Sequence, residues 1–362
     1  MESEREKPIL NLMSANTKTD LVVQPVRQKP PSMQKGFTEV RVSGKSIQVP
    51  SVVIKDHPVI VTGTWLKLAA VKDEDLVEGE VFEDPQMFIN GLKQSKLGAD
   101  LFTFSQTLPA IEPKHSFHLE WDNAAVVPIT TYKEWLEKRV EYDVRKAIKK
   151  AAKQGVMVKS VPFDGALVQG IVDIYAESST RQGKTFWHYQ KDFDTVKHEA
   201  GTYLEKCEFI GAYLHDELIG FIKMAHIGKI TATIHVIAKK KHFDKKATNA
   251  LLAKAVEICE LRGSTHLMYG SYVYNDPASS LTEFKRRNGF EQVLLPRYYV
   301  PLTLKGWIAL KAKLHHGVRG MIPVNVKKPI LKMRTAFHGR MRKFNKVRVP
   351  DSGADGRPIA EA

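Results

Sequence analysis

The segment from Cys207 to Thr303 constrains the fold most, because its apolar patterns follow one another in a fixed order. Two apolar runs flank the polar turn from Leu214 to Glu217, which predicts a β-hairpin. The next run, 229–238, is rich in β-branched residues and predicts a third strand. From Asp244, apolar residues recur at helical spacing up to Gly263, which predicts a helix. A hairpin, a strand and a helix therefore form the start of one α/β unit.

A further strand, helix and strand complete the unit. A strand is expected at 266–274, followed by a short helix that opens with a capping box of Ser280 and Glu283. The last run contains Pro296 and Pro301, so it fits an edge or interrupted strand better than a central one. The whole order predicts an α/β fold, with a mixed β-sheet crossed by helices.

Length and composition agree with this prediction. The chain has 362 residues, of which 43% are hydrophobic, enough for about two domains of ~150 residues with buried cores. The first 35 residues are polar and contain prolines, and we expect a disordered arm at 1–35 and a disordered tail at 350–362.

Targeting and cysteine signals favour a cytoplasmic protein. No run approaches the roughly 18 apolar residues that span a bilayer, and the two cysteines, Cys207 and Cys259, form no CxxC pair. His115 and His118 are three residues apart in an apparent strand, where they would face opposite sides. The sequence therefore predicts no metal site.

The excess positive charge is concentrated near the C-terminus. The net charge is +15, and residues 302–349 contain thirteen Lys and Arg and no acidic residue. Trp307, Leu310 and Leu314 repeat at helical spacing, which predicts a basic amphipathic helical extension at 304–349. Three interpretations stay open: contact with an anionic membrane surface, which would make the protein peripheral, binding of RNA phosphates, or docking on the core.

A second basic segment precedes the unit. Residues 132–155 place apolar residues on one stripe and Lys and Arg elsewhere, which predicts one long amphipathic helix that ends at Gly155. Its charged face is either solvated or bound to an anionic partner.

The segment RKAIKKAAKQGV (145–156) is followed by a strand, the helix FDGALVQGIVDIYAES (163–178), an aromatic loop and the sheet described above. This series resembles the FemAB-like branch of the GNAT acyltransferase superfamily. The resemblance implies a GNAT-like mixed sheet flanked by helices, in two GNAT-like units of which the first is degenerate. The expected divisions are an N-terminal α/β region at 36–131, a GNAT acyltransferase domain at 132–303 and the basic extension at 304–349.

The resemblance implies transfer of an acyl or aminoacyl group from a thioester or aminoacyl donor to an amine acceptor, by direct attack in a ternary complex. The donor would lie between the fourth and fifth strands of the unit, 229–238 and 266–274. Acetyl-CoA users carry Q/R-x-x-G-x-G/A after the fourth strand, because glycine lets the backbone close around phosphate. This chain has Phe243, Lys246 and Thr248 there.

The donor is therefore left open between acyl-CoA, another acyl thioester such as one on an acyl carrier protein, and aminoacyl-tRNA. The alternative function is that of a catalytically silent GNAT-fold protein that holds an anionic ligand, a lipid surface or a nucleic acid. The sequence predicts no oligomeric state.

Candidate site residues follow from this placement. Tyr274 is the expected general acid for the leaving group, and His188 is a candidate proton acceptor, although structural roles are open for both. The aromatic loop at 179–193 combines rigid rings with hydrogen-bonding groups, as ligand pockets do, or it plugs the sheet. The expected donor-binding residues are His235, Val236, Ile237, Ala238, Lys245, Lys246 and Asn249. The expected acceptor-binding residues are Arg181, Gln182, Phe186, Trp187, Tyr189, Tyr272 and Arg297.

Overall fold

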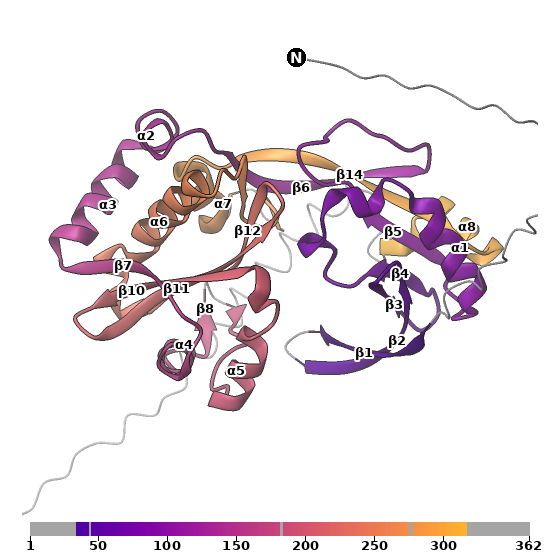
Figure 1. Cartoon of the computed structure of the whole chain (residues 1–362), viewed down its shortest axis with the longest axis horizontal. Helices are drawn as coiled ribbons and strands as arrows, with labels where there is room; N and C mark the ends of the chain where they lie inside the picture. The colour runs from indigo at the N-terminus through magenta and orange to yellow at the C-terminus, as the bar shows by residue number, and fades with distance from the viewer. Residues whose placement is uncertain (1–33, 43–44, 182–183, 275–277, 317–362) are drawn as a thin grey trace, which may run out of the picture.

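One large mixed sheet runs through the computed structural model, which describes residues 34–42, 45–181, 184–274 and 278–316 (Figure 1). Within these ranges the sheet has 12 strands, in the order β1-β2-β3-β4-β5-β14-β6-β13-β12-β11-β10-β7. Its strands are β1 (Lys35–Val42), β2 (Lys45–Ile54), β3 (His57–Thr62), β4 (Leu68–Val71), β5 (Leu101–Ser105), β6 (His118–Pro128), β7 (Val156–Val161), β10 (Cys207–Leu214), β11 (Glu217–Ile227), β12 (Ile230–Ala238), β13 (His266–Met268) and β14 (Glu291–Pro301).

Helices cover both faces of this sheet, and a two-stranded hairpin lies beside it. The hairpin consists of β8 (Thr180–Arg181) and β9 (Lys184–Thr185). The α-helices are α1 (Pro85–Ser95), α2 (Tyr132–Glu134), α3 (Tyr142–Lys153), α4 (Gly165–Ala176), α5 (Phe193–Ala200), α6 (Ala247–Leu261), α7 (Ser280–Arg287) and α8 (Leu304–Lys311). Short helical turns are η1 (Glu74–Leu76), η2 (Gly79–Phe82), η3 (Trp135–Arg139), η4 (Leu204–Lys206), η5 (Lys240–Lys245) and η6 (Leu314–His316).

The half of the sheet from β1 to β5 packs on α1. Its core is aromatic: Phe88 of α1 stacks on Phe102 of β5, which in turn stacks on Phe104. All three side chains are fully buried, so this face of the sheet is closed by α1. The predicted boundaries of this region, 36–131, stay a prediction.

The half from β13 to β7 is covered on both faces (Figure 1). Leu251, Leu252 and Val256 of α6 pack with Ile222 of β11 on one face. On the other face, Ile171 of α4 packs with Phe221, the next residue of β11. Successive residues of a strand point to opposite faces, so β11 contributes to two cores and is buried along most of its length.

The strands β6 and β14 join the two halves. β14 pairs with β6 over Glu291–Tyr299 and with β5 over Arg297–Pro301, so it is a central, uninterrupted strand and the prediction of an edge strand is wrong. The carbonyl of Pro296 accepts a hydrogen bond from Gln106, just beyond the end of β5. The nitrogen and oxygen of one strand residue face the same neighbour, so the missing N–H of Pro296 costs no bond to β6. Pro301 ends the strand.

The predicted long helix at 132–155 is also wrong, because it is interrupted. α2 continues into the wider turn η3, and Val140 then adopts an extended conformation before α3 begins. At the break, the N–H of Glu141 donates to the carbonyl of Arg287 in α7. A hydrogen bond to a distant helix thus replaces the local helical bond, which no local pattern reveals.

Other local predictions are confirmed, with small shifts. The hairpin of β10 and β11 turns at His215 and Asp216, and α6 ends just before Gly263, whose φ is +68°. The α7 cap is Ser279, which accepts a hydrogen bond from the Thr282 N–H, so the predicted box at Ser280 and Glu283 is one residue late.

The described part of the basic extension is short. Leu310 of α8 is buried against Leu101 and Tyr299, whereas Trp307 and Ile308 are half exposed. The apolar stripe is therefore only partly docked, and contact with a membrane or RNA stays a prediction. Residues 1–33, Gln182 and 317–362 lie outside the described residues. In the described ranges, no helix combines the length and apolar character needed to cross a membrane.

Candidate active site

Two neighbouring parallel strands separate where a ligand could enter. β12 pairs with β13 over Ile230–Ala232 and His266–Met268 only, although β12 continues to Ala238. The register between β11 and β12 also shifts beside Lys223 and Met224, and the shift leaves Ile234 as an extra residue. Such a bulge bends a strand. The sheet therefore splays between β12 and β13, at the place that the sequence predicts for the donor.

A cavity of about 360 Å³ opens beside this splay, and we call it the splay cavity. It is bounded by the end of β12, the start of α6 and the start of α7. Its lining residues are Arg181, Val236, Ala238, His242, Phe243, Lys246, Ala247, Thr248, Asn249, Tyr269, Ser280, Leu281 and Phe284. Five of the predicted site residues, on three separate segments, thus lie together: Arg181, Val236, Ala238, Lys246 and Asn249.

Arg181 is the one lining residue with buried, unpartnered nitrogens in the described chain. Its Nη1 donates to the carbonyl of Ala238 at 2.9 Å, and the guanidinium stacks 4.5 Å from the centre of the Phe186 ring. Nε and Nη2 are buried and have no hydrogen-bond partner among the described residues. Buried donors without partners are costly, so these two atoms indicate an acceptor, such as a carbonyl or phosphate oxygen, that a ligand would supply.

The start of α6 offers a second set of donors. Lys246 occupies its N-cap position in a left-handed conformation, with φ of +60°, and no side chain caps the helix. Ala247 and Thr248, the first residues of α6, line the cavity. Free N–H groups at a helix N-terminus favour anionic groups. The helical turn η5 takes the place of a glycine-rich loop, so any phosphate would meet lysine side chains and these N–H groups rather than a glycine cradle.

The remaining predicted donor-binding residues lie elsewhere. Ile237 packs in the core formed with α4, on the face of β12 opposite to Val236 and Ala238. His235 contacts the ring of Phe221 on that opposite face, with the ring centroids 6.2 Å apart. Burial lowers the pKa of His235 to about 3. Lys245 forms an ion pair with Asp244 and does not line the cavity.

The aromatic loop is divided between packing and exposure. Phe186 packs edge-on against Tyr175 of α4, and Tyr189 is half-buried, whereas Trp187 is largely exposed. The His188 ring lies 4.6 Å from the Tyr175 ring, and burial lowers the pKa of His188 to about 4. A neutral imidazole with so low a pKa is a weak proton acceptor at neutral pH.

The loop after β13 is held by a buried lysine. Lys285 of α7 donates from Nζ to the carbonyl of Ser271 at 2.6 Å, and Nζ lies 4.6 Å from the Tyr269 ring and 4.8 Å from the Tyr274 ring. Tyr274 is half exposed, and burial of part of its ring raises its pKa, so it stays protonated at neutral pH. Its hydroxyl lies over Gly270, where φ is +53°.

Tyr272, by contrast, packs against the core formed by α6 and does not line the splay cavity. The predicted strand at 266–274 is therefore a strand only to Met268, and a loop that carries the tyrosines follows it.

A second cavity, which the sequence did not predict, lies on the other side of β13. We call it the carboxylate cavity; it measures about 450 Å³. Met268 lines it, whereas the next residue, Tyr269, lines the splay cavity, so the end of β13 separates the two. Its charged and polar lining residues include Glu74, Asp75, Glu78, Glu83, Gln106, Lys114, His115 and Lys229.

Asp75 is one of the carboxylates that line this cavity. Its side chain is accessible from the cavity yet crowded by protein atoms, which raises the pKa of its carboxyl. In the described part of the chain it accepts no hydrogen bond. Its charge is also one cause of the raised pKa of Tyr274, after burial, so the two residues lie within electrostatic range of each other. No sequence motif marks Asp75, because it lies on the isolated turn η1.

Arg297, a predicted acceptor-binding residue, lies behind this cavity. It pairs with Glu74 and Asp122, and its side chain is 17% exposed. Burial opposes its charge, but the two carboxylates outweigh burial and raise its pKa. Its hydrogen-bonding groups are thus bound to protein partners, and it holds Glu74 at the cavity wall.

Comparison with solved structures identifies the fold. The superposition on the crystal structure of FemX covers 77% of this chain and 90% of the FemX chain, with a TM-score of 0.50 at 11% sequence identity. This chain has the FemX fold. The fold expected from the resemblance seen in the sequence is thus confirmed.

Two further structures are similar at lower scores. The C-terminal domain of a putative lysylphosphatidylglycerol synthetase from Agrobacterium fabrum covers 73% of this chain and 87% of its own, at 13% identity and a TM-score of 0.48. L-PGS from Bacillus licheniformis covers 74% and 88%, at 13% identity and a TM-score of 0.47. No family model and no curated protein sequence matches the chain.

Proposed function

We propose that this chain transfers an acyl or aminoacyl group from an activated ester or thioester, bound in the splay cavity, to an amine bound in the carboxylate cavity. The observation that carries the proposal is Arg181 in the wall of the splay cavity, because its Nε and Nη2 are buried and have no partner in the part of the chain that the structure describes. The FemX-like fold supports the proposal as a second, independent finding.

The donor would be held by hydrogen bonds from Arg181 and from the start of α6. A donor with phosphate groups, whether a CoA thioester or an aminoacyl nucleic acid, also suits Lys246 at the cavity mouth. Because no glycine-rich loop surrounds the site, the phosphate groups would be bound through the charge of lysine side chains more than through a close-fitting backbone.

The acceptor amine would lie near Asp75. An amine attacks only through its neutral lone pair, and its nitrogen must lose a proton as the new C–N bond forms and the C–O or C–S bond breaks. We assign acceptance of that proton to Asp75, whose raised pKa makes it a stronger base than an ordinary carboxylate. Tyr274 would protonate the departing oxygen or sulfur, since it carries its proton at neutral pH. Direct attack requires the two reacting atoms to meet at the end of β13, which separates the two cavities.

The test combines donor binding with turnover. The purified chain is mixed in turn with acyl-CoAs, an acylated carrier protein and aminoacyl-tRNA, and binding is followed by native mass spectrometry and thermal stabilisation. Amide formation is then measured with a set of small primary amines. Stabilisation by one donor class together with amide formation is the expected result. Failure of every donor to bind the folded chain would contradict the proposal.

Binding without transfer would instead support the alternative of a catalytically silent binding protein. To tie either outcome to the site, Arg181→Met is compared with Lys184→Met, which removes an exposed charge from the same β8–β9 hairpin. Loss of hydrogen bonds from a charged group costs about 1.5–3 kcal/mol, so Arg181→Met should weaken donor binding roughly ten- to hundredfold. Lys184→Met should leave it unchanged.

A further inference from the structure

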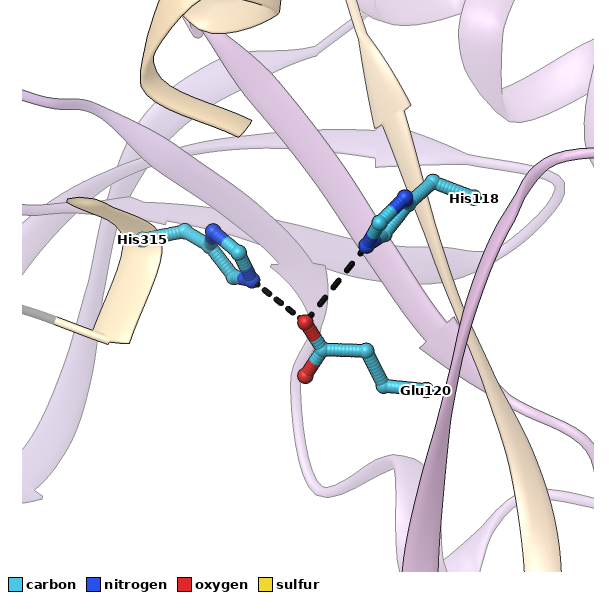
Figure 2. A group of neighbouring side chains, drawn as sticks. All are labelled: His118, Glu120 and His315. Carbon is cyan, nitrogen blue, oxygen red and sulfur yellow. Dashed lines mark hydrogen bonds and ion pairs between the residues drawn. The ribbon is translucent and has the colours of Figure 1, made fainter. Parts of the chain in front are cut away.

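Three histidines and one glutamate gather where the segment after β14 meets β6. None of these four residues lines the splay cavity or the carboxylate cavity. His118 and Glu120 are two residues apart in β6, so they share one face of the strand. His315 and His316 come from η6, which follows α8. Figure 2 shows His118 and His315 directed from opposite sides toward the Glu120 carboxylate. Ligand atoms of these three residues all lie within 4.8 Å of one another.

The spacing of the donor atoms is that of a metal site. Glu120 Oε1 lies 2.8 Å from His315 Nε2 and 3.5 Å from His118 Nε2, and Oε2 lies 2.8 Å from His316 Nε2. Zinc binds nitrogen and oxygen at about 2.0–2.2 Å in a tetrahedron, which separates neighbouring donors by roughly 3.3 Å. The two separations from Glu120 Oε1 lie on either side of that value, and the ligand atoms of His118, Glu120 and His315 all lie within 4.8 Å of one another.

The ligands rest on a fixed support. Tyr299 of β14 is paired with His118 in the sheet, and the His315 ring packs 4.7 Å from the Tyr299 ring. The His315 side chain is fully buried, and its Nδ1 has no hydrogen-bond partner among the described residues, so packing and the hydrogen bond between Nε2 and Glu120 set the ring orientation. At the start of α8, Thr303 and Lys305 both bond to Asp100, which fixes the other end of the segment.

We propose that His118, Glu120 and His315 bind one zinc ion. Two imidazoles and one carboxylate suit zinc better than magnesium or calcium, which prefer oxygen ligands. His316, whose Nε2 lies 2.8 Å from Glu120 Oε2, adjoins this set and is a candidate for the fourth position of a zinc site. Because the ligands belong to β6 and to η6, the ion would fasten the segment after β14 to the centre of the sheet. This inference is independent of the transferase proposal.

The proposal is tested on the full chain without any affinity tag, after removal of metal by a chelator. Zinc is titrated calorimetrically, and bound zinc is measured by mass spectrometry after dialysis. Wild type should bind one zinc ion. His118→Ala should bind none, or should bind it at least about tenfold more weakly than wild type does. His118 is exposed, so this variant should fold normally, and zinc should raise the thermal midpoint of wild type but not of the variant.

His215→Ala is the matched control, because it removes an exposed histidine from the β10–β11 turn and should bind zinc as wild type does. His315→Ala removes a ligand from the other segment and should lose zinc as well. Two results would overturn the proposal: wild type binds no zinc, or His118→Ala and His315→Ala both bind it as tightly as wild type. In either case the cluster is a hydrogen-bonded histidine and glutamate network without a metal.

Discussion

Lys285 gives the sharpest energetic prediction, because it is a fully buried lysine that no carboxylate pairs with in the described chain. Its Nζ bonds to the Ser271 carbonyl and contacts two tyrosine rings, but these groups do not replace the hydration of an ammonium. Burial therefore lowers the pKa of Lys285 from 10.5 to about 8. We predict that Lys285→Met, which keeps the stem and removes the ammonium, abolishes a pH-dependent part of the stability.

The sign follows from proton binding. Between pH 8 and 10.5 the unfolded chain keeps the Lys285 proton, whereas the folded chain has released it. Unfolding then takes up a proton, so the free energy of unfolding rises with pH across this window. A shift from 10.5 to about 8 corresponds to about 3 kcal/mol, at 1.36 kcal/mol for each pKa unit. Wild type should gain this amount, relative to Lys285→Met, between neutral pH and the top of the window.

Urea unfolding followed by tryptophan fluorescence measures the effect at several pH values. Other tyrosines and cysteines also titrate in this range, but they cancel in the difference between wild type and variant. Lys153→Met, at an exposed position of α3, is the control and should give a difference that does not change with pH. The Lys285 Nζ resonance, assigned by its loss in the variant, should titrate near pH 8. Parallel stability curves, or titration near 10.5, would refute the reasoning.

Two further substitutions probe the site. Gly270→Ala should lower the free energy of unfolding by about 1 kcal/mol, because alanine disfavours the left-handed conformation. It should also slow transfer, because the new Cβ would lie 2.6 Å from the Tyr274 hydroxyl. The control Gly263→Ala, also at positive φ but with nothing within 4 Å of its Cβ, should show the stability cost alone in urea unfolding and leave the turnover rate unchanged. Arg297→Met should cost roughly 3–5 kcal/mol at neutral pH, because it leaves Glu74 and Asp122 unpaired. Because burial raises the pKa of Glu74, part of that loss should be regained when urea unfolding is measured at pH values below neutral, where the Glu74 carboxyl takes up a proton. Arg262→Met, at a half-exposed position, should be nearly neutral.

The sequence predicted most where the pattern is local. The hairpin at His215, the strand β12 and the helix α6 all follow from residue spacing within one element, and each is confirmed. Residue spacing did not reveal the bulge at Ile234, which changes which residues of β12 point toward α6. Consequently Val236 and Ala238 line the splay cavity while Ile237 does not.

The sequence-based predictions were wrong where contacts between distant segments determine the local structure. The break between η3 and α3 depends on the Arg287 carbonyl, and the central position of β14 depends on where β5 ends beside Pro296. The same holds for function. Asp75 lies within electrostatic range of Tyr274 although 199 positions separate them in the sequence. His315 reaches β6 only after β14 has returned to the first half.

The shortness of β13 connects these features physically. Had β13 continued alongside β12, its backbone would have filled the splay, and Tyr269 to Tyr274 would have been strand residues facing alternately into two cores. Because pairing stops at Met268, the next residues form a loop with Gly270 in a left-handed conformation and Tyr274 folded back over it. Lys285 then holds this loop through the Ser271 carbonyl, at the cost of burying its own charge. The early end of one strand thus opens a cavity on one side and places a protonated tyrosine within electrostatic range of Asp75 on the other.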